Sequence, residues 1–375
     1  MANSNLGIRR IHSIEISVFD VEPWLSYWTR GFGFQHIATS SGDAIETSGS
    51  RRHLLRCRDL GIVLQEKIHG GSPVARFLAK HPEGISRVNF LVSDAAEAEE
   101  RLLECHATPT DFVTSNTIAR GQWRQVGIAT PLGDVEFCFV EHTDEADGLM
   151  PGMEQTAAFD PDRDPIGLKG IDHLTANMRT LMPVIAFFEH VMGFKRYWDV
   201  QFHTNDIRPG IGSGLKSIVM WDEESGIKMA NNEPLRPRFN ESQVQVNVDD
   251  NGGPGIQHMS LEVVDIAKAA EHLAGSGIEF LPTPKAYYES LPNRLQASGI
   301  GDLEPPVSDL QRLGLLVDGN KDGHVLQAFC KDQSKTFGRR NAGPLYIELI
   351  QRCGGRGFGE GNFRALFEAA ESGNR

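Results

Sequence analysis

The feature that most constrains the fold of this chain is an internal repeat. In each half, a short alternating apolar run leads through a proline into an amphipathic helical stretch that closes with Gly33-Phe34 or Gly193-Phe194. Near the end of each half, the apolar run of residues 130–140 answers that of residues 343–350, in a register uncertain by one residue. Such self-similarity decides how many structural units a chain contains. We therefore predict a duplicated α+β protein.

The helices of the repeat carry start signals. In each half a further alternating apolar run ends at an aspartate, Asp94 or Asp265, directly before an Ala-rich stretch with helical spacing. An aspartate at that place can accept a hydrogen bond from an N–H group of the first helical turn. We therefore expect helices over residues 95–103 and 266–273.

Length and one irregular segment predict the domain organisation. A chain of 375 residues exceeds the roughly 150 residues of an ordinary domain, which suggests two or three domains. Residues 144–165 are rich in Asp, Pro and Gly and lack periodicity, which is typical of a linker. We expect an N-terminal structural domain over residues 1–155 and a C-terminal catalytic domain over residues 156–375.

Composition excludes several classes of function. Hydrophobic residues make up 40% and charged residues 23% of the chain, as in soluble globular proteins, and no apolar run approaches the roughly 20 residues that span a bilayer. The net charge of −13 argues against a nucleic-acid surface. The first residues lack a secretory signal, and the five cysteines are scattered without a CxxC pair. We expect a cytoplasmic protein with neither nucleic-acid nor membrane partners.

Three metal-competent side chains of the second half each stand alone in a β-type apolar run: His173, His258 and Glu348. An unpartnered ionisable group is costly there, and two imidazoles with one carboxylate are the ligand set of non-heme Fe(II) oxygenases. The aligned first half has Ser13 in place of His173 and Arg87 in place of His258. We therefore expect the metal site in the second half and a structural role for the first.

Taken singly, these residues have simpler explanations. A lone histidine in a strand is more often a hydrogen-bonded core residue, and a lone glutamate usually faces solvent; the repeat favours the metal because all three occupy equivalent positions of repeated units. The two-residue period of a strand also predicts where two neighbouring side chains point. His12 is one residue out of phase with Ser13 and is expected on the opposite face. Gln257 should face away from His258 unless the strand is bulged there.

The end of the chain has the pattern of a hinge and a helix. A glycine-rich loop over residues 354–361 leads to Asn362, which suits a helix cap, and apolar residues then follow at helical spacing as far as Glu371. This pattern predicts a lid. The alternative is a terminal helix that is simply docked on the core.

The second half resembles the family of 4-hydroxyphenylpyruvate dioxygenase and hydroxymandelate synthase, in the vicinal-oxygen-chelate superfamily. The matching segments, in family order, are residues 170–173, 213–217, 232–234, 242–245, 255–258, 286–288, 326–329, 347–352 and 357–363. The resemblance implies duplicated βαβββ units that form two vicinal-oxygen-chelate domains, with an open mixed β-barrel and a C-terminal helix in the second half.

The resemblance also implies roles for individual residues. Fe(II) would be held by His173, His258 and Glu348. The polar and aromatic groups around the reacting molecule would be the catalytic Gln257 and Gln327 and the substrate-binding Ser217, Asn232, Gln243, Phe329, Tyr346, Phe358, Asn362 and Phe363. A phenol in an apolar cavity needs such hydrogen-bond partners. The neighbouring Gln245 is interpreted as a strand-surface residue.

Three features depart from the family pattern. Tyr346 stands where the dioxygenases commonly have Phe, Ala230 stands where many have Pro, and residues 331–343 form a longer connection than usual. The added hydroxyl of Tyr346 could hydrogen-bond the substrate, which leaves the identity of the aryl side chain open.

The activity that the resemblance implies is that of an Fe(II)-dependent dioxygenase of tyrosine degradation. It would convert 4-hydroxyphenylpyruvate, an aryl 2-oxo acid, and O2 to homogentisate and CO2, as a homodimer or homotetramer. One alternative is benzylic hydroxylation to a hydroxymandelate, or oxygenation of another arylpyruvate. An alternative of a different class is a non-oxidative metal-dependent lyase, isomerase or binding protein of the same superfamily.

Overall fold

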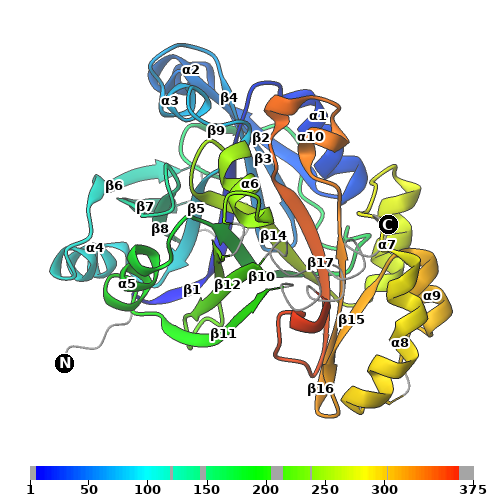
Figure 1. Cartoon of the computed structure of the whole chain (residues 1–375). Helices are drawn as coiled ribbons and strands as arrows, with labels where there is room; N and C mark the ends of the chain where they lie inside the picture. The colour runs from blue at the N-terminus through cyan, green and yellow to red at the C-terminus, as the bar shows by residue number, and fades with distance from the viewer. Residues whose placement is uncertain are drawn as a thin grey trace.

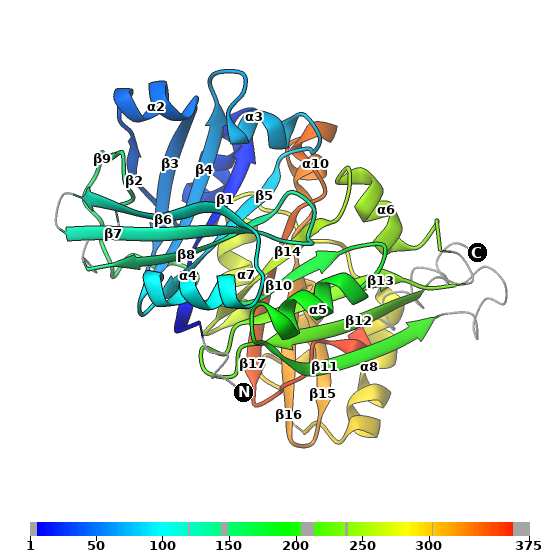
Figure 2. The same cartoon turned by 90° about the vertical axis from the view of Figure 1, so that its left-hand side faces the viewer.

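The computed structural model describes residues 6–118, 121–143, 149–203, 214–236, 239–301 and 303–362. Two large curled sheets lie side by side, one from each half of the chain (Figures 1 and 2). The first runs from blue to teal in the figures, and the second from green to red.

The first half contains two βαβββ units. Its strands are β1 (Ile8–Val18), β2 (Gln35–Ser40), β3 (Ser50–Cys57), β4 (Leu60–Lys67), β5 (Gly84–Val92), β6 (Pro109–Ile118), β7 (Gly121–Ala129), β8 (Glu136–His142) and β9 (Met153–Gln155). Its helices are α1 (Val21–Ser26), η1 (Tyr27–Gly31), α2 (Gly42–Ser48), α3 (Pro73–Leu78) and α4 (Ala95–Glu104). The sheet order is β6-β7-β8-β5-β1-β4-β3-β2-β9, so that the two units meet at the antiparallel pair of β1 and β5.

The second half repeats this plan. Its strands are β10 (Leu168–Asn177), β11 (Lys195–His203), β12 (Gly214–Trp221), β13 (Lys228–Pro234), β14 (Gly255–Val263), β15 (Leu316–Asn320), β16 (Gly323–Phe329) and β17 (Tyr346–Cys353). Its helices are α5 (Met182–His190), α6 (Gln243–Asp250), α7 (Ile266–Gly275), α8 (Lys285–Ser298), α9 (Val307–Leu313), α10 (Gln333–Thr336) and η2 (Arg340–Ala342). The sheet order is β11-β12-β13-β10-β14-β17-β16-β15.

This arrangement confirms the expected fold class. The second sheet is mixed, because β10 pairs in parallel with β13 and β14 with β17, whereas the other neighbouring pairs are antiparallel. Its outer strands β11 and β15 lie at opposite ends of the sheet order, so the barrel is open. The expected C-terminal helix and its role as a lid fall on residues 363–375, outside the described residues.

The predicted helix caps are confirmed. Asp94 accepts hydrogen bonds from two N–H groups of the first turn of α4, at 2.8 and 3.0 Å, and Asp265 accepts one from Lys268 N, at 3.1 Å. Both helices turn an apolar face to the core, with Leu102 and Leu273 buried. A cap of this kind typically contributes about 1 kcal/mol to helix stability.

The two halves share one continuous hydrophobic core. Trp28 and Phe137 of the first half belong to the same buried cluster as Phe188 and Leu349 of the second. The rings of Phe137 and Phe188 lie 6.1 Å apart, centroid to centroid. Burying a large apolar side chain contributes roughly 1.5–3 kcal/mol, so the halves stabilise one another. The division into domains at residue 155 stays a prediction.

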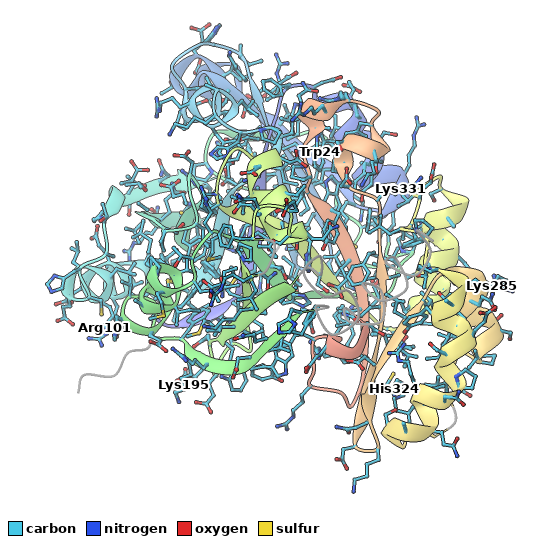
Figure 3. All side chains as sticks on the ribbon, in the orientation of Figure 1. Trp24, Arg101, Lys195, Lys285, His324 and Lys331 are labelled. Carbon is cyan, nitrogen blue, oxygen red and sulfur yellow. The ribbon has the colours of Figure 1, made fainter. Side chains whose placement is uncertain are left out.

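The long connection between β16 and β17 reaches over to the first half. Phe337, at the end of α10, packs against Trp24 of α1 with the ring centroids 5.3 Å apart, and Arg339 forms an ion pair with the buried Glu83 at 2.9 Å. Glu83 also accepts a hydrogen bond from Trp24 Nε1 at 2.8 Å. Figure 3 shows Trp24 close to this connection, which starts near Lys331. The connection therefore helps to hold the two halves together.

Part of the expected linker has regular structure. β9 adds a short ninth strand to the edge of the first sheet, where Ala38 of β2 pairs with Gln155, and Met150 is buried beside it. Residues 149–157 thus cover the first sheet instead of running free between the halves. In the part of the chain that the structure describes, every helix is too short or too polar to cross a membrane.

Candidate metal centre

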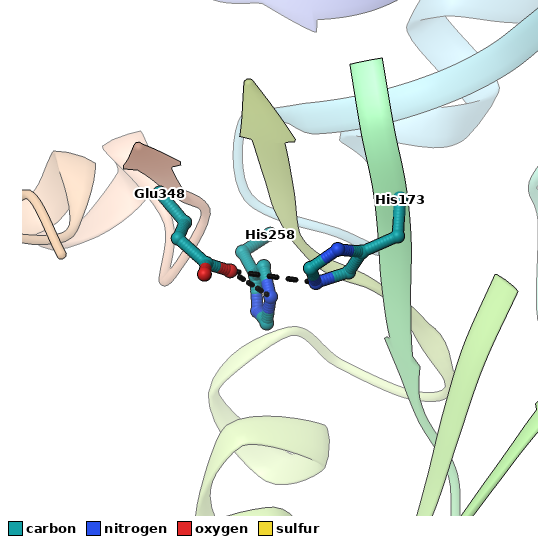
Figure 4. A group of neighbouring side chains, drawn as sticks. All are labelled: His173, His258 and Glu348. Carbon is teal, nitrogen blue, oxygen red and sulfur yellow. Dashed lines mark ion pairs between the residues drawn. The ribbon is translucent and has the colours of Figure 1, made fainter. Parts of the chain in front are cut away.

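Three adjacent strands at the centre of the second sheet bring His173, His258 and Glu348 together. In the register of β10, β14 and β17, His173 lies opposite Ser260 and Ser260 lies opposite Glu348. The Nε2 atoms of His173 and His258 lie 3.4 and 3.2 Å from Glu348 Oε2 (Figure 4). All three side chains are buried, and their potential ligand atoms lie within 4.8 Å of one another.

This donor set fits a divalent metal ion. The Nε2 atom of His258 is buried and makes no hydrogen bond to any described residue, although Glu348 Oε2 is close by. Such an atom is costly unless something binds it. Two imidazole nitrogens and one carboxylate oxygen on one side of an ion leave further coordination positions open, as in non-heme iron sites.

Two β-bulges orient the histidine rings. Asp172 on β10 and Gln257 on β14 each fall between consecutive residue pairs and have no residue opposite them. A bulge breaks the alternation of side chains, so each of these residues places its side chain beside the histidine that follows it. Nδ1–H of His173 donates to Asp172 Oδ1 at 2.8 Å, and Nδ1–H of His258 donates to Gln257 Oε1 at 3.0 Å. Both Nε2 atoms are thereby left for the metal. The strand is therefore bulged at Gln257, which was the condition under which this side chain could lie beside His258.

Charges behind His173 reinforce this arrangement. Arg352 binds both carboxylate oxygens of Asp172, at 2.5 and 2.7 Å, and Lys228 Nζ lies 3.8 Å from it. Burial alone would raise the pKa of Asp172, but hydrogen bonds from Arg352 and His173 lower it strongly. Asp172 is therefore a carboxylate, which makes the His173 ring more basic.

The pKa values of the three candidate ligands shift in different directions. Burial would lower the pKa of His173, but Glu348 and Asp172 raise it, whereas burial keeps the pKa of His258 below its usual value. Burial would raise the pKa of Glu348, but His173 and His258 lower it. Glu348 is thus ionised, and the site favours a positive charge among these three side chains.

Two of the predicted substrate-binding residues lie further along the face of the second sheet that carries the triad. Ser217 of β12 pairs with Asn232 of β13, and Asn232 pairs with Asn177 of β10, four residues along the strand from His173. Asn232 Nδ2 donates to Asn177 Oδ1 at 3.0 Å, and Asn177 Nδ2 donates to Asn247 Oδ1 of α6 at 2.9 Å. The structure thus places these polar groups on the face that holds the triad.

Aromatic side chains flank the triad. The Phe358 ring meets the His173 ring edge to face, with centroids 5.1 Å apart, and it packs on Val219 and Ala230. Tyr346 stacks on the His258 ring at 4.7 Å, and Phe329 lies 6.3 Å from Tyr346. These contacts give the triad an apolar surround.

The hydroxyl of Tyr346 is engaged within the protein. It donates to Gln257 Oε1 at 3.3 Å, and burial raises its pKa, so it stays protonated. The Oε1 atom of Gln257 therefore accepts from both His258 and Tyr346, which orients the amide. Its Nε2 is left as a donor.

The remaining predicted residues differ in their environments. Gln327 Nε2 donates to Glu348 Oε1 at 2.8 Å, and Asn362 Nδ2 donates to Gln327 Oε1 at 2.9 Å. Gln243, in the first turn of α6, is exposed, and Phe363 lies outside the described residues. The interpretation of Gln245 as a strand-surface residue is wrong: the residue lies in a helix and is buried, because the helical period turns it inward. The roles of all these side chains stay predictions.

Sequence reasoning missed Asp172, Arg352 and Asn177 as members of the site. Asp172 and Arg352 lie in two of the segments that match the family, residues 170–173 and 347–352, and this was the available signal. By regular alternation Asp172 would have faced away, so only the bulge reveals its place beside His173.

The first half has bulges in the same two places. His12 on β1 and Ser86 on β5 have no residue opposite them. The expectation that His12 faces away from Ser13 is therefore wrong: its Nδ1 lies 3.0 Å from Ser13 Oγ. In the registers of the two sheets, Ser13 takes the place of His173, Arg87 that of His258 and Cys138 that of Glu348.

Fold and donor set together define a class of protein, the vicinal-oxygen-chelate enzymes. The family model described as Glyoxalase/Bleomycin resistance protein/Dioxygenase superfamily matches residues 170–291, which run from β10 into α8.

Curated relatives narrow this class. A 4-hydroxyphenylpyruvate dioxygenase of Danio rerio is 33% identical over 373 residues, covering 96% of this chain and 89% of that protein. One of Dictyostelium discoideum is 30% identical over 355 residues, covering 92% and 93%. The chain belongs to the 4-hydroxyphenylpyruvate dioxygenase family, and it is an enzyme of the dioxygenase type.

A solved structure shows the same fold. A triple mutant of 4-hydroxymandelate synthase from Streptomyces coelicolor superposes with a TM-score of 0.81 at 24% identity, covering 98% of this chain and all of that one. The likeness therefore extends over both halves.

Proposed function

We propose that this enzyme converts 4-hydroxyphenylpyruvate and O2 to homogentisate and CO2, with Fe(II) held by His173, His258 and Glu348. The observation that carries the proposal is the buried triad, whose two Nε2 atoms face one carboxylate oxygen. It is supported by relatives of that name which are 30 and 33% identical over almost the whole chain.

Fe(II) held at this site would supply Lewis-acid binding of a 2-oxo acid and activation of dioxygen, the chemistry of oxidative decarboxylation. The surrounding side chains fix its ligands. Asp172 and Gln257 hold the rings through Nδ1, and Gln327 holds Oε1 of Glu348. Metal-ligating histidines depend on such partners for their orientation.

Gln257 is suited to bind the oxo-acid end of the substrate. Its Oε1 is taken by His258 and Tyr346, so its Nε2 can donate to an anionic oxygen next to the metal. A neutral amide does this without changing the charge of the site.

The phenol end is proposed to lie at Ser217 and Asn232. Because Asn232 gives its Nδ2 to Asn177, its Oδ1 is left to accept the phenol hydroxyl. Val219, Ala230 and Phe358 form an apolar wall between this polar end and the triad, which keeps water from the ring. The two ends then hold the substrate beside its oxidant, at high effective concentration.

An assay of oxygen uptake, CO2 release and product identity with Fe(II) and 4-hydroxyphenylpyruvate tests this function. We expect equimolar O2 and CO2, with homogentisate as product. A hydroxymandelate would establish benzylic hydroxylation, turnover of another arylpyruvate alone would change the substrate, and product without oxygen uptake would point to a lyase or isomerase.

The matched variants are His258→Ala and His190→Ala. His258→Ala should lose iron and turnover, whereas His190, exposed at the end of α5, should be dispensable. A His258→Ala protein that keeps both iron and turnover would contradict the metal site.

We also propose a homodimer or homotetramer in the cytoplasm. All five cysteines are free, which suits a reducing compartment. Light scattering on the purified protein and fractionation of cells test the two statements separately.

A further inference from the structure

A line of four buried side chains runs from the triad to helix α8. Gln327 Nε2 donates to Glu348 Oε1 at 2.8 Å, Asn362 Nδ2 donates to Gln327 Oε1 at 2.9 Å, and the Tyr287 hydroxyl donates to Asn362 Oδ1 at 2.7 Å. Each of the four side chains belongs to a residue that is 1% exposed. The line therefore operates without solvent, where an unmade hydrogen bond is most costly.

The direction of every bond in this line follows from its ends. An ionised carboxylate only accepts, so Gln327 must present its NH2 group to Glu348 and its oxygen to Asn362. Asn362 must then present its own oxygen to Tyr287. At the outer end, Val317 N donates to the Tyr287 oxygen at 2.9 Å. Val317 O lies 3.2 Å from the same oxygen, but the single hydroxyl hydrogen goes to the nearer Asn362 Oδ1, at 2.7 Å. Turning either amide over would bring two acceptors together.

The line decides which oxygen of Glu348 faces the metal position. Because Oε1 is bound by Gln327, Oε2 is the atom that lies 3.2 and 3.4 Å from the two Nε2 atoms. A carboxylate released from Gln327 could rotate and offer either oxygen or both.

The line also passes through the last described segment of the chain, residues 358–362. Gly361 N donates to Asp318 Oδ2 at 2.9 Å, and a side chain at Gly359, where φ is +76°, would collide with the Gln327 amide. This segment and the Gln327 amide are therefore in close contact, and Phe358 at its start packs on His173.

We propose that Tyr287 is a positioning residue for the metal ligand Glu348. Through Asn362 and Gln327 it keeps Oε2 toward the metal, and it couples the docking of residues 358–362 to metal binding. The inference rests on the proposed metal site and adds to it a residue that touches neither metal nor substrate.

The test compares Tyr287→Phe with Tyr288→Phe. Tyr288, the next residue on α8, is 5% exposed, and its hydroxyl donates to the carbonyl of Leu315, at 3.1 Å. Both variants lose one buried hydroxyl, but Tyr287→Phe also leaves Val317 N and Asn362 Oδ1 without a partner, so it should lose more thermal stability than Tyr288→Phe. Anaerobic titration with Fe(II), and with Co(II) as a second probe, should show an affinity about tenfold weaker for Tyr287→Phe, as for losses behind a metal ligand. Tyr288→Phe should match the wild type.

Two outcomes would overturn the inference. If neither variant lost metal affinity, Tyr287 would have no effect on the metal site; if both lost it equally, the effect would come from the loss of any buried hydroxyl of α8. A wild-type protein that binds neither ion would overturn the metal site and this inference together. The titration needs no substrate, so its outcome is independent of which reaction the enzyme catalyses.

Asn362→Asp supplies a second line of test. The change keeps the shape of the side chain but replaces the donor facing Gln327 by an acceptor, and it should weaken metal binding in the same direction. Combined with Tyr287→Phe, the loss should be no greater than that of the worse single variant, because residues of one hydrogen-bonded unit are not additive. Additive losses would show that the two side chains act separately.

Discussion

In both halves of the chain, the central antiparallel pair of strands carries three bulges at equivalent places, and two of them lie beside the triad or its counterpart. In the second half the bulged residues, Asp172 and Gln257, hold the rings of two metal-ligand candidates. In the first half the bulged residues are His12 and Ser86, and the following positions carry Ser13 and Arg87. The bulges are therefore a feature of the fold that both halves share, whereas a metal site requires the particular side chains that only the second half has at these positions.

In the first half, the position that corresponds to the metal site is occupied by an arginine paired with two carboxylates. Arg87 lies between Glu136, whose Oε2 accepts from its Nε at 2.6 Å, and Glu15, 3.9 Å away. Asn89 also donates to Glu15, at 2.9 Å. A guanidinium thus supplies from within the chain the positive charge that a metal ion would supply in the second half. A buried charge requires such pairing.

The largest contrast is expected for the third ligand position. Glu348→Ala should lose the metal and reduce kcat/KM by more than about 1000-fold, beyond the roughly 10–100-fold that the loss of a partner behind a ligand costs. Cys138→Ala, at the equivalent position of the first sheet, should keep wild-type iron content. Iron analysis and oxygen uptake measure both. Loss of iron in Cys138→Ala would break the division of labour between the halves.

Arg87→Ala should act on stability and leave the metal site intact. Removing one partner of a buried ion pair costs about 3 kcal/mol, because Glu15, 2% exposed, loses its cation. Arg51→Ala is the control: its pair with Glu66 is more exposed and should cost less than about 1 kcal/mol. Urea unfolding of the two variants decides, and a similar cost for both would show that the first half does not depend on this charge.

Asp172→Asn tests the charge behind one ligand. The amide can still accept from His173 Nδ1, but Arg352 and Lys228 lose their carboxylate, and metal affinity should fall roughly 10–100-fold. The effect should exceed that of Gln257→Glu at the other bulge, which retains an acceptor for His258. If neither variant changes the titration, the bulges orient the rings by shape alone.

Tyr346→Phe should have the smallest effect. It removes one hydrogen bond to Gln257 worth about 1 kcal/mol and keeps the stacking on His258. We expect KM for 4-hydroxyphenylpyruvate to rise by up to about fivefold, with kcat almost unchanged. A change of product instead of KM would give the hydroxyl a direct part in the reaction.

The sequence predicted the duplicated fold, the helix caps and three side chains that the structure brings together. Repeats and caps are local patterns, and His173, His258 and Glu348 stood out as lone ionisable groups in apolar runs. The bulges were not predictable, because a bulge is a mismatch between two strands and neither strand shows it alone. The third pair of segments was misaligned as well. Matching residue 130 with residue 343 sets Glu136 against Leu349, whereas the strand registers align Glu136 with Tyr346.

The connection that joins Arg339 and Phe337 to Glu83 and Trp24 has a consequence for the history of such a chain. The strand that carries Glu348 begins directly after this connection, so the half with the triad takes part of its shape from the half without it. A duplicated copy that has lost its ligands would ordinarily be free to decay. Here the first half contacts the connection that leads into the strand of Glu348, so a change in the first half would be expected to disturb the triad, and selection on the reaction would act on both halves.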